Sequence, residues 1–175
     1  AGRRAGAERA MVSRVGGGRA GMPEVVRGLA LAGACVGVAG PADPIEGPPE
    51  PGDRLVGVRS SGVHSNGLTL AREAVTRAGD YDDPFPPDPD RTVGEALLEP
   101  TRIYTDLLGP ARDHATGAAH VTGGGWTNLE RMGERRYEVT DPFDPQPVFD
   151  HVQACGGVSD AGRYPTRNMG TGCGP

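Results

Sequence analysis

Lysine is absent from this 175-residue sequence, and all 18 basic side chains are arginines. Catalysis through a Schiff-base lysine and phosphate binding through a P-loop lysine are therefore excluded for this chain. Aromatic residues make up only 5% of the sequence, so a core must be built mainly from Val, Leu, Ile and Ala. A chain of this length suits one domain, or one domain and the edge of another.

Cysteine is scarce as well. Cys35, Cys155 and Cys173 are odd in number and form no Cys-x-x-Cys pair. This pattern argues against a disulfide framework and against a zinc site, and it favours a reducing cytoplasm. We therefore predict no metal site within this chain and a cytoplasmic location.

Long hydrophobic runs are missing too. The longest apolar stretch, Leu29–Ala39, is too short to cross a bilayer. Arg27 followed by Leu29–Cys35 faintly resembles a secretory or lipoprotein signal. The apolar part starts too deep in the chain for such a signal, and Val36–Val38 continues it as a strand would. We expect no membrane partner.

Charge is distributed unevenly along the chain. Residues 1–27 carry six Arg against two acids, whereas residues 28–175 carry twelve Arg against 21 acids. An acidic body argues against a sequence-independent nucleic-acid surface. The lack of Lys with a surplus of Asp suits a halophilic organism or a GC-rich genome, although acidic surfaces also occur in ordinary proteins.

Strand-like and helix-like segments alternate along the sequence, which predicts an α/β (α+β layered) fold. Apolar residues at helical spacing predict three helices, which begin after Gly67, after Pro100 and after Asp144. Pro110 is expected to end the second helix, and Asp144 is expected to cap the third. The expected strands are Leu29–Ala39, Arg54–Val58, Ala118–Val121, Arg136–Val139 and a final one within Asn168–Pro175. Trp126–Met132 is expected to be a short helix, Asp80–Asp90 a loop, and residues 1–21 either disordered or unrelated to the rest.

The segment Ser60–Gly67 places polar side chains in a glycine-containing turn between a strand and a helix. A His at this position can transfer a proton near neutral pH, and the following helix N-terminus can attract anions. His64 and Asn66 are the candidate catalytic residues, and Ser60, Ser61 and Ser65 are candidate ligands. The alternative is a simple capping turn in which Ser65 or Asn66 caps the helix and His64 is exposed.

Two further segments carry possible phosphate ligands. His120 and Thr122 run into three glycines, Gly123, Gly124 and Gly125, whose N–H groups can form an anion nest or merely a tight turn. Pro100 is expected to place Thr101 and Arg102 in a first helical turn, where Arg102 either grips phosphate or is a solvated surface residue. Asn168 lies in a small polar loop that has no specific chemistry of its own.

Taken together, these four segments resemble the aminoimidazole ribonucleotide synthetases (phosphoribosylformylglycinamidine cyclo-ligases). Gly52–Gly67 matches the family pattern Gly-Asp-x-Leu-x-Gly-x-x-Ser-Ser-Gly-x-His-Ser-Asn-Gly. The Pro-Thr-Arg-Ile-Tyr block, the His-x-Thr-Gly-Gly-Gly block and the Asn-Met-Gly-x-Gly block follow in the family order. The resemblance covers about residues 22–172.

The resemblance implies an enzyme that uses ATP and Mg²⁺ to close the imidazole ring of formylglycinamidine ribonucleotide in purine biosynthesis. It implies that 22–47 is the remnant of an N-terminal ATP-binding domain and that 48–175 is a C-terminal α/β domain, incomplete at its end. ATP and Mg²⁺ would be held mainly by the missing N-terminal domain, and the full-length enzyme would be a homodimer. His64 and Asn66 would face the formylglycinamidine group, while Arg102 and Gly123–Gly125 would hold phosphate.

Two departures from the family pattern stand out. Gly16–Gly21 lacks the two carboxylates that the family carries there, and Tyr164–Gly170 has Pro165 and Arg167 in place of Arg and Phe. The basic start and the abrupt end predict a truncated or partly frame-shifted reading of a longer gene, which is inactive by itself. The alternatives are a sister enzyme, such as thiamine-monophosphate kinase, selenophosphate synthetase or the formylglycinamidine amidotransferase, and a non-catalytic phosphate-ligand-binding module.

Overall fold

The computed structural model describes residues 2–18, 21, 24, 26, 28, 30–45, 47–157 and 170–174. The chain forms two compact units, Ala1–Pro44 and Ile45–Pro175, which are described separately below. The helix of the first unit is α1 (Gly2–Arg9). The elements of the second unit, in chain order, are β1 (Val58–Arg59), η1 (Ser65–Gly67), α2 (Leu68–Ala78), β2 (Pro84–Phe85), β3 (Asp88–Thr92), α3 (Val93–Leu97), η2 (Thr105–Leu107), α4 (Leu108–His114), β4 (Ala119–His120), η3 (Gly125–Met132), α5 (Pro147–Gly156) and β5 (Thr171–Gly174).

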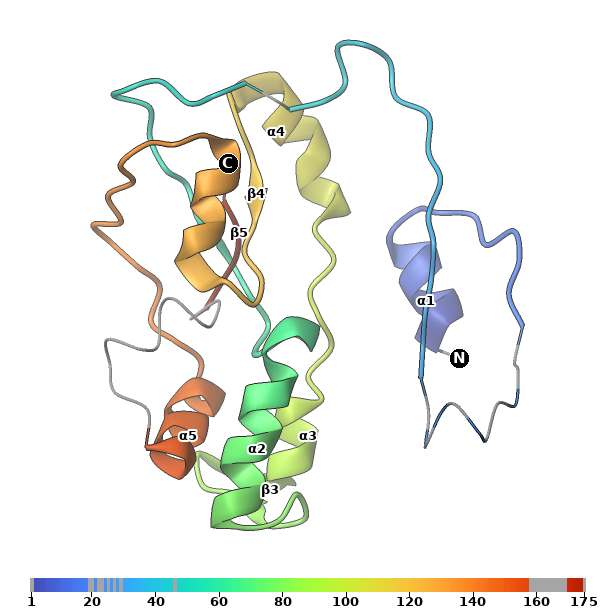
Figure 1. Ribbon diagram of the computed structural model, residues 1–175, viewed down its shortest axis with the longest axis vertical. Helices are drawn as coiled ribbons and strands as arrows, with labels where there is room; N and C mark the ends of the chain where they lie inside the picture. The colour runs from blue at the N-terminus through green and yellow to red at the C-terminus, as the bar shows by residue number, and fades with distance from the viewer. Residues whose placement is uncertain are drawn as a thin grey trace. The chain divides into compact units, whose positions relative to one another are not determined.

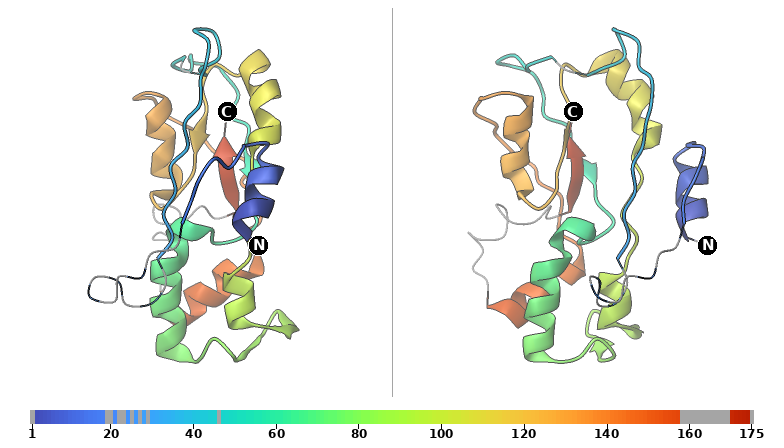
Figure 2. Two further views of the ribbon diagram at one scale, coloured as in Figure 1. Left: turned by 90° about the vertical axis from the view of Figure 1, so that its right-hand side faces the viewer. Right: turned by 45° about the vertical axis from the view of Figure 1, so that its right-hand side comes forward.

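The second unit is organised around a small antiparallel sheet with the strand order β1-β5-β4. The last strand in the sequence, β5, is therefore the central one, as Figures 1 and 2 show. Cys173 pairs with Val58 of β1 on one side and with His120 of β4 on the other. The mixture of helices and small antiparallel sheets confirms the predicted α/β (α+β layered) class.

Helices α2, α3 and α5 and the β2–β3 hairpin form the main apolar core at the other end of this unit (Figure 1). The helix predicted after Gly67 forms as α2 and buries Ala71 and Val75. Phe149 and Val152 of α5 are almost fully buried in the same cluster. A smaller cluster lies near the sheet and joins Ala119, Leu129 and Met132 to the partly buried side chains of Leu55, Trp126, Tyr137 and Val139.

The Asp80–Asp90 segment was expected to be a loop, but it contains most of the β2–β3 hairpin. The helix that follows, α3, was not expected either. Its start is a capping box, in which the Glu95 N–H donates to Thr92 Oγ1 and the Thr92 N–H donates to the Glu95 carboxylate. Thr-x-x-Glu was visible in the sequence, but five helical residues are too few for a periodic apolar pattern.

The expectation for Pro100 and Pro110 was wrong. Residues 100–104 are not helical, so Thr101 and Arg102 do not lie in a first helical turn. Pro110 lies in the first turn of α4 rather than after its end. Proline is tolerated there because the first-turn N–H groups have no partner within the helix.

Smaller corrections concern element ends. The predicted strand Arg54–Val58 forms only at Val58–Arg59, and Arg136–Val139 packs on the second cluster without pairing as a strand. Helix α5 begins after Gln146 and not after Asp144, with no side-chain cap. Ala119–His120, Gly125–Met132 and Thr171–Gly174 form close to where the sequence predicted them, although residues 168, 169 and 175 lie outside the described residues.

The first unit differs from its predictions. Gly2–Arg9 is helical, which does not fit the expected disorder, and the alternative that residues 1–21 are unrelated to the rest stays a prediction. Ala and Arg are good helix formers, and Arg4 pairs with Glu8 one turn on. The described part of Leu29–Ala39 is not a strand, and Val36 and Val38 are fully exposed. No described strand pairs with it. The assignment of 22–47 to another domain stays a prediction.

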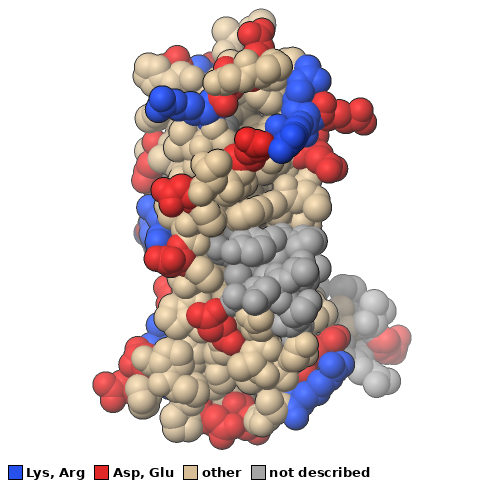
Figure 3. Space-filling view, turned by 90° about the vertical axis from the view of Figure 1, so that its left-hand side faces the viewer, with Lys and Arg blue, Asp and Glu red and all other residues tan. Residues whose placement is uncertain are grey.

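Charged side chains of both signs are interspersed on the face of the molecule shown in Figure 3. Arg77 and Glu73 form one exposed pair, and Arg136 and Glu138 form another. Such pairs add little to stability because water screens them. Within the described ranges, no helix combines the length and the apolar character needed to span a membrane.

Replacing Phe149 tests the main core. Phe149→Ala should lower the free energy of unfolding by about 3–5 kcal/mol, because it removes a fully buried ring and leaves a cavity. Leu98→Ala is the matched control, since Leu98 is 74% exposed and should change stability by less than about 0.5 kcal/mol. Urea unfolding followed by circular dichroism measures both. Equal effects of the two substitutions would contradict the assigned core.

Candidate functional site

His64 has an unusual backbone conformation. Its φ of 59° and ψ of 177° fall in a region that is essentially restricted to glycine. The residue is also buried, with 6% of its surface exposed. A non-glycine residue held in this region costs about 1–3 kcal/mol, and such strain concentrates at functional sites. A capping turn with an exposed His64, the alternative considered above, is therefore wrong.

The His64 ring is held by Ser61. The Ser61 N–H lies 3.1 Å from Nε2 of His64, and Ser61 Oγ lies 3.0 Å from the same nitrogen. The Ser61 hydroxyl lies 2.6 Å from the Pro100 carbonyl, and its one rotating hydrogen can point either to that carbonyl or to Nε2, whereas the direction of the backbone N–H is fixed. The backbone N–H can donate only to an unprotonated Nε2. This geometry therefore favours the neutral tautomer with its proton on Nδ1, an assignment made from the hydrogen bonds.

Electrostatics favour the same protonation state. Burial lowers the pKa of His64 below its ordinary value of 6.5, and charge on His120 lowers this pKa further. Both effects disfavour the imidazolium. His64 is thus neutral at neutral pH, which suits it to donate one hydrogen bond or accept one proton, but not to supply a positive charge.

Tyr104 brings the two histidines together. Its ring centroid lies 6.4 Å from that of His64 and 6.0 Å from that of His120. The Tyr104 hydroxyl donates to the carbonyl of Arg59 at 3.4 Å, and Arg102 Nη1 donates to the same oxygen at 3.2 Å. The structure therefore gathers the predicted residues His64, His120 and Arg102. Tyr104, which ends the Pro-Thr-Arg-Ile-Tyr block, was not among the predicted site residues.

The central strand packs directly against this group. A Cβ on Gly172 would overlap the Tyr104 hydroxyl and lie 3.2 Å from Cε1 of His64. The Gly172 carbonyl accepts the Val121 N–H at 3.1 Å, which fixes the strand next to β4. Only a residue without a side chain lets the β5 backbone approach the two rings so closely.

Ser60 has a structural explanation. It is 3% exposed, its N–H donates to the Gly170 carbonyl, and its own carbonyl accepts from Gln146 Nε2 at 2.6 Å. Gln146 thus ties the start of α5 to the turn that carries His64, and no pattern in the sequence pointed to this. Ser65 Oγ and Thr101 Oγ1 lie 3.3 Å apart. Asn168 and the side chain of Asn66 lie outside the described part of the chain.

Some polar groups of the glycine turn after β4 already make hydrogen bonds within the turn. The Gly125 N–H donates to the Thr122 carbonyl, and both the N–H and the hydroxyl of Thr122 donate to Asn128 Oδ1. A Cβ on Gly124 would overlap Nδ2 of Asn128. Tight packing thus accounts for Gly124, and the anion nest at Gly123–Gly125 stays a prediction.

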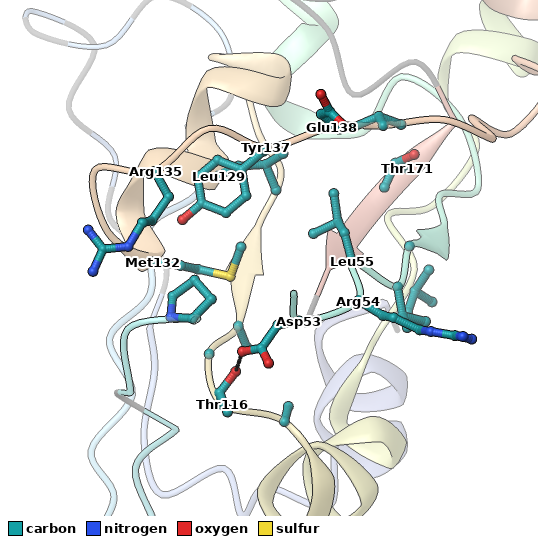
Figure 4. Close-up of a pocket in the computed structure, with 18 of the residues that line it drawn as sticks. Asp53, Arg54, Leu55, Thr116, Leu129, Met132, Arg135, Tyr137, Glu138 and Thr171 are labelled. Atoms are coloured by element: carbon teal, nitrogen blue, oxygen red, sulfur yellow. Dashed lines mark hydrogen bonds between the residues drawn. The ribbon is translucent and has the colours of Figure 1, made fainter. Parts of the chain in front are cut away.

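A groove of about 1330 Å³ lies apart from these residues, within the second unit. It is lined mainly by apolar side chains from 49–58, 107–118 and 126–143, together with Val121 and Thr171, and Figure 4 shows Leu55, Met132 and Tyr137 facing it. The Thr116 hydroxyl donates to Asp53 at its edge. None of the predicted site residues lines this groove. Among the described residues, no three His, Cys, Asp or Glu side chains gather as metal ligands.

Similarity to known proteins was found over most of the chain. The family model described as "AIR synthase related protein, C-terminal domain" matches residues 50–170. The phosphoribosylformylglycinamidine cyclo-ligase of Methanosarcina acetivorans is 44% identical over 170 residues, and that of Methanopyrus kandleri is 48% identical over 178 residues. Each match covers 95% of this chain, but only 51% and 50% of the respective relative. The chain thus spans about half the length of these relatives.

Glycine at position 64 tests whether the backbone there is strained. His64→Gly should be more stable than His64→Ala by about 1 kcal/mol. Relief of about 1–3 kcal/mol of strain is offset by about 0.5–1 kcal/mol of glycine chain entropy. Both variants lose the imidazole, so their difference isolates the backbone.

Ser65 provides the control pair. It lies next to His64, in η1, and does not have a positive φ. Ser65→Gly should therefore be less stable than Ser65→Ala. Thermal unfolding of the four variants measures both differences. If the glycine variant were less stable than the alanine variant at both positions, the result would argue against strain at His64.

Proposed function

This chain belongs to the family described as AIR synthase related protein, C-terminal domain, and we propose that it forms part of the active site of an ATP-dependent cyclo-ligase. The reaction would close formylglycinamidine ribonucleotide to aminoimidazole ribonucleotide in purine biosynthesis. Relatives that carry the cyclo-ligase name match 95% of the chain and support this proposal. The observation that carries it is the buried, strained and neutral His64 beside His120, Tyr104 and Arg102.

The chemistry of ring closure needs negative charge to be stabilised at one oxygen. ATP supplies the phosphoryl group that turns the formyl oxygen into a leaving group. An amidine nitrogen then forms the new C–N bond, the C–O bond breaks, and phosphate departs while the nitrogen loses its proton. Charge builds on the formyl oxygen as the C–O bond breaks and phosphate departs, so a preorganised hydrogen-bond donor near that oxygen lowers the barrier.

His64 fits the role of such a donor. Ser61 occupies Nε2 with its N–H, which leaves the proton on Nδ1. A neutral imidazole donating from Nδ1 can stabilise the developing oxyanion without first gaining a proton. For His64, stabilising charge is thus favoured over the proton transfer that the sequence suggested. Asn66 is proposed to face the same group, and Arg102, Thr101, Ser65 and the Gly123–Gly125 turn to hold phosphate.

ATP and Mg²⁺ would be held mainly outside this chain. The described residues offer no cluster of acidic or His side chains that fits Mg²⁺. We therefore assign no step of the reaction to a metal bound here. A homodimeric full-length enzyme in the cytoplasm is proposed on the same family likeness.

Replacing His64 in a full-length protein that contains this chain tests the proposal. His64→Ala should lower kcat about 10²–10³-fold, the usual loss for one oxyanion donor. In the unmutated enzyme, kcat/KM should fall with decreasing pH only below about 6.5, because the neutral form is active and its pKa is lowered. His114→Ala is the control, since this histidine is exposed at the end of α4. Near-normal turnover by His64→Ala would end the proposal.

A further inference from the structure

Tyr104 contacts both imidazoles of the site and has no role assigned so far. It lies just before η2, in a segment that has no regular secondary structure. Its ring is 6.4 Å from His64 and 6.0 Å from His120, at interplanar angles of 60° and 67°. Tilted arrangements at these distances are the favourable ones for aromatic pairs.

The position of the Tyr104 ring is fixed at several points. Its hydroxyl donates to the Arg59 carbonyl in β1, and Gly172 of β5 lies directly against that hydroxyl. Two strands of the sheet thereby hold the far end of the side chain. The ring lies beside His64, a residue with only 6% of its surface exposed.

We propose that Tyr104 is a positioning residue that fixes the His64 and His120 imidazoles and keeps water away from His64. This inference rests on the proposed function, because it is His64 that acts on the substrate. The phenol itself touches no reacting atom in this account. The ring is the essential part, while the hydroxyl only anchors it.

Several charged or titratable groups surround His64. His120 faces it from β4, and Arg59 belongs to the neighbouring β1. Glu99 lies next to Gly62 in the turn that carries His64, since a Cβ built on Gly62 would be 3.6 Å from the Cβ of Glu99. The Glu99 carboxylate is paired with Arg91 at 3.2 Å. Arg102 belongs to the Tyr104 segment. Removing the Tyr104 ring would expose His64 to water and thus reduce the lowering of its pKa by burial. Water would also weaken the lowering of this pKa by the charge on His120.

Proton NMR of the histidine rings in the 175-residue chain tests the inference without any turnover. The sequence has four histidines, of which His114 and His151 lie away from the site and serve as references. In the unmutated chain His64 should titrate below pH 6.5. Tyr104→Phe should leave this midpoint unchanged, because the ring remains. Tyr104→Ala should move it up toward the ordinary value of about 6.5.

An unchanged His64 midpoint in Tyr104→Ala, with the two reference histidines unaltered, would overturn the inference. If Tyr104→Ala does not fold, the unmutated chain still decides. Tyr104 ring protons must then show nuclear Overhauser effects to both imidazoles, and absence of either contact would overturn the inference equally.

Turnover of a full-length protein that contains this chain separates this inference from the proposed function. Tyr104→Ala should lower kcat about a hundredfold with a smaller change in KM, because His64 is displaced. In the pH profile of kcat/KM for Tyr104→Ala, the apparent pKa of the acidic limb should rise by the same amount as the NMR midpoint. Tyr104→Phe should keep both kcat and this apparent pKa at the values of the unmutated enzyme. A shifted NMR midpoint with unaltered turnover would contradict the role of His64 in the reaction but keep the positioning by Tyr104. An unshifted His64 midpoint in Tyr104→Ala would contradict the positioning by Tyr104 but would leave the role of His64 in the reaction uncontradicted.

Discussion

The candidate site depends on the pairing of β5 with both β1 and β4. These strands come from distant parts of the chain, and β5 lies between them as the last element in the sequence. Gly172 makes this arrangement possible, because any side chain there would collide with Tyr104. The same backbone contact that completes the sheet therefore brings the His64 turn, the Tyr104 segment and the His120 strand to one place.

The conformation of His64 connects stability to chemistry. The Ser61 N–H and the burial of the ring both favour the neutral imidazole, while the positive φ opposes folding by a modest amount. Contacts with Tyr104 and the packing of β5 offset that strain. Under the proposed function, a donor preorganised in this way would need no rearrangement when charge develops on a bound substrate.

The sequence predicted what local patterns determine, and it missed what distant contacts determine. The helical spacing of apolar residues after Gly67 predicted α2, and the ordered motifs predicted the family. The roles of Tyr104 and Gly172 could not be predicted, because they arise where three strands meet. Pro110 was misplaced because proline fits the first turn of a helix as well as the position beyond its end.

The tautomer of His64 tests the central claim most directly. Long-range correlation of imidazole nitrogens with ring protons distinguishes a protonated Nδ1 from a protonated Nε2. At pH 7 we predict that Nδ1 carries the proton of His64 and that Nε2 is unprotonated, as the donation from Ser61 requires. A doubly protonated ring at that pH, or a proton on Nε2 alone, would contradict this account of the site.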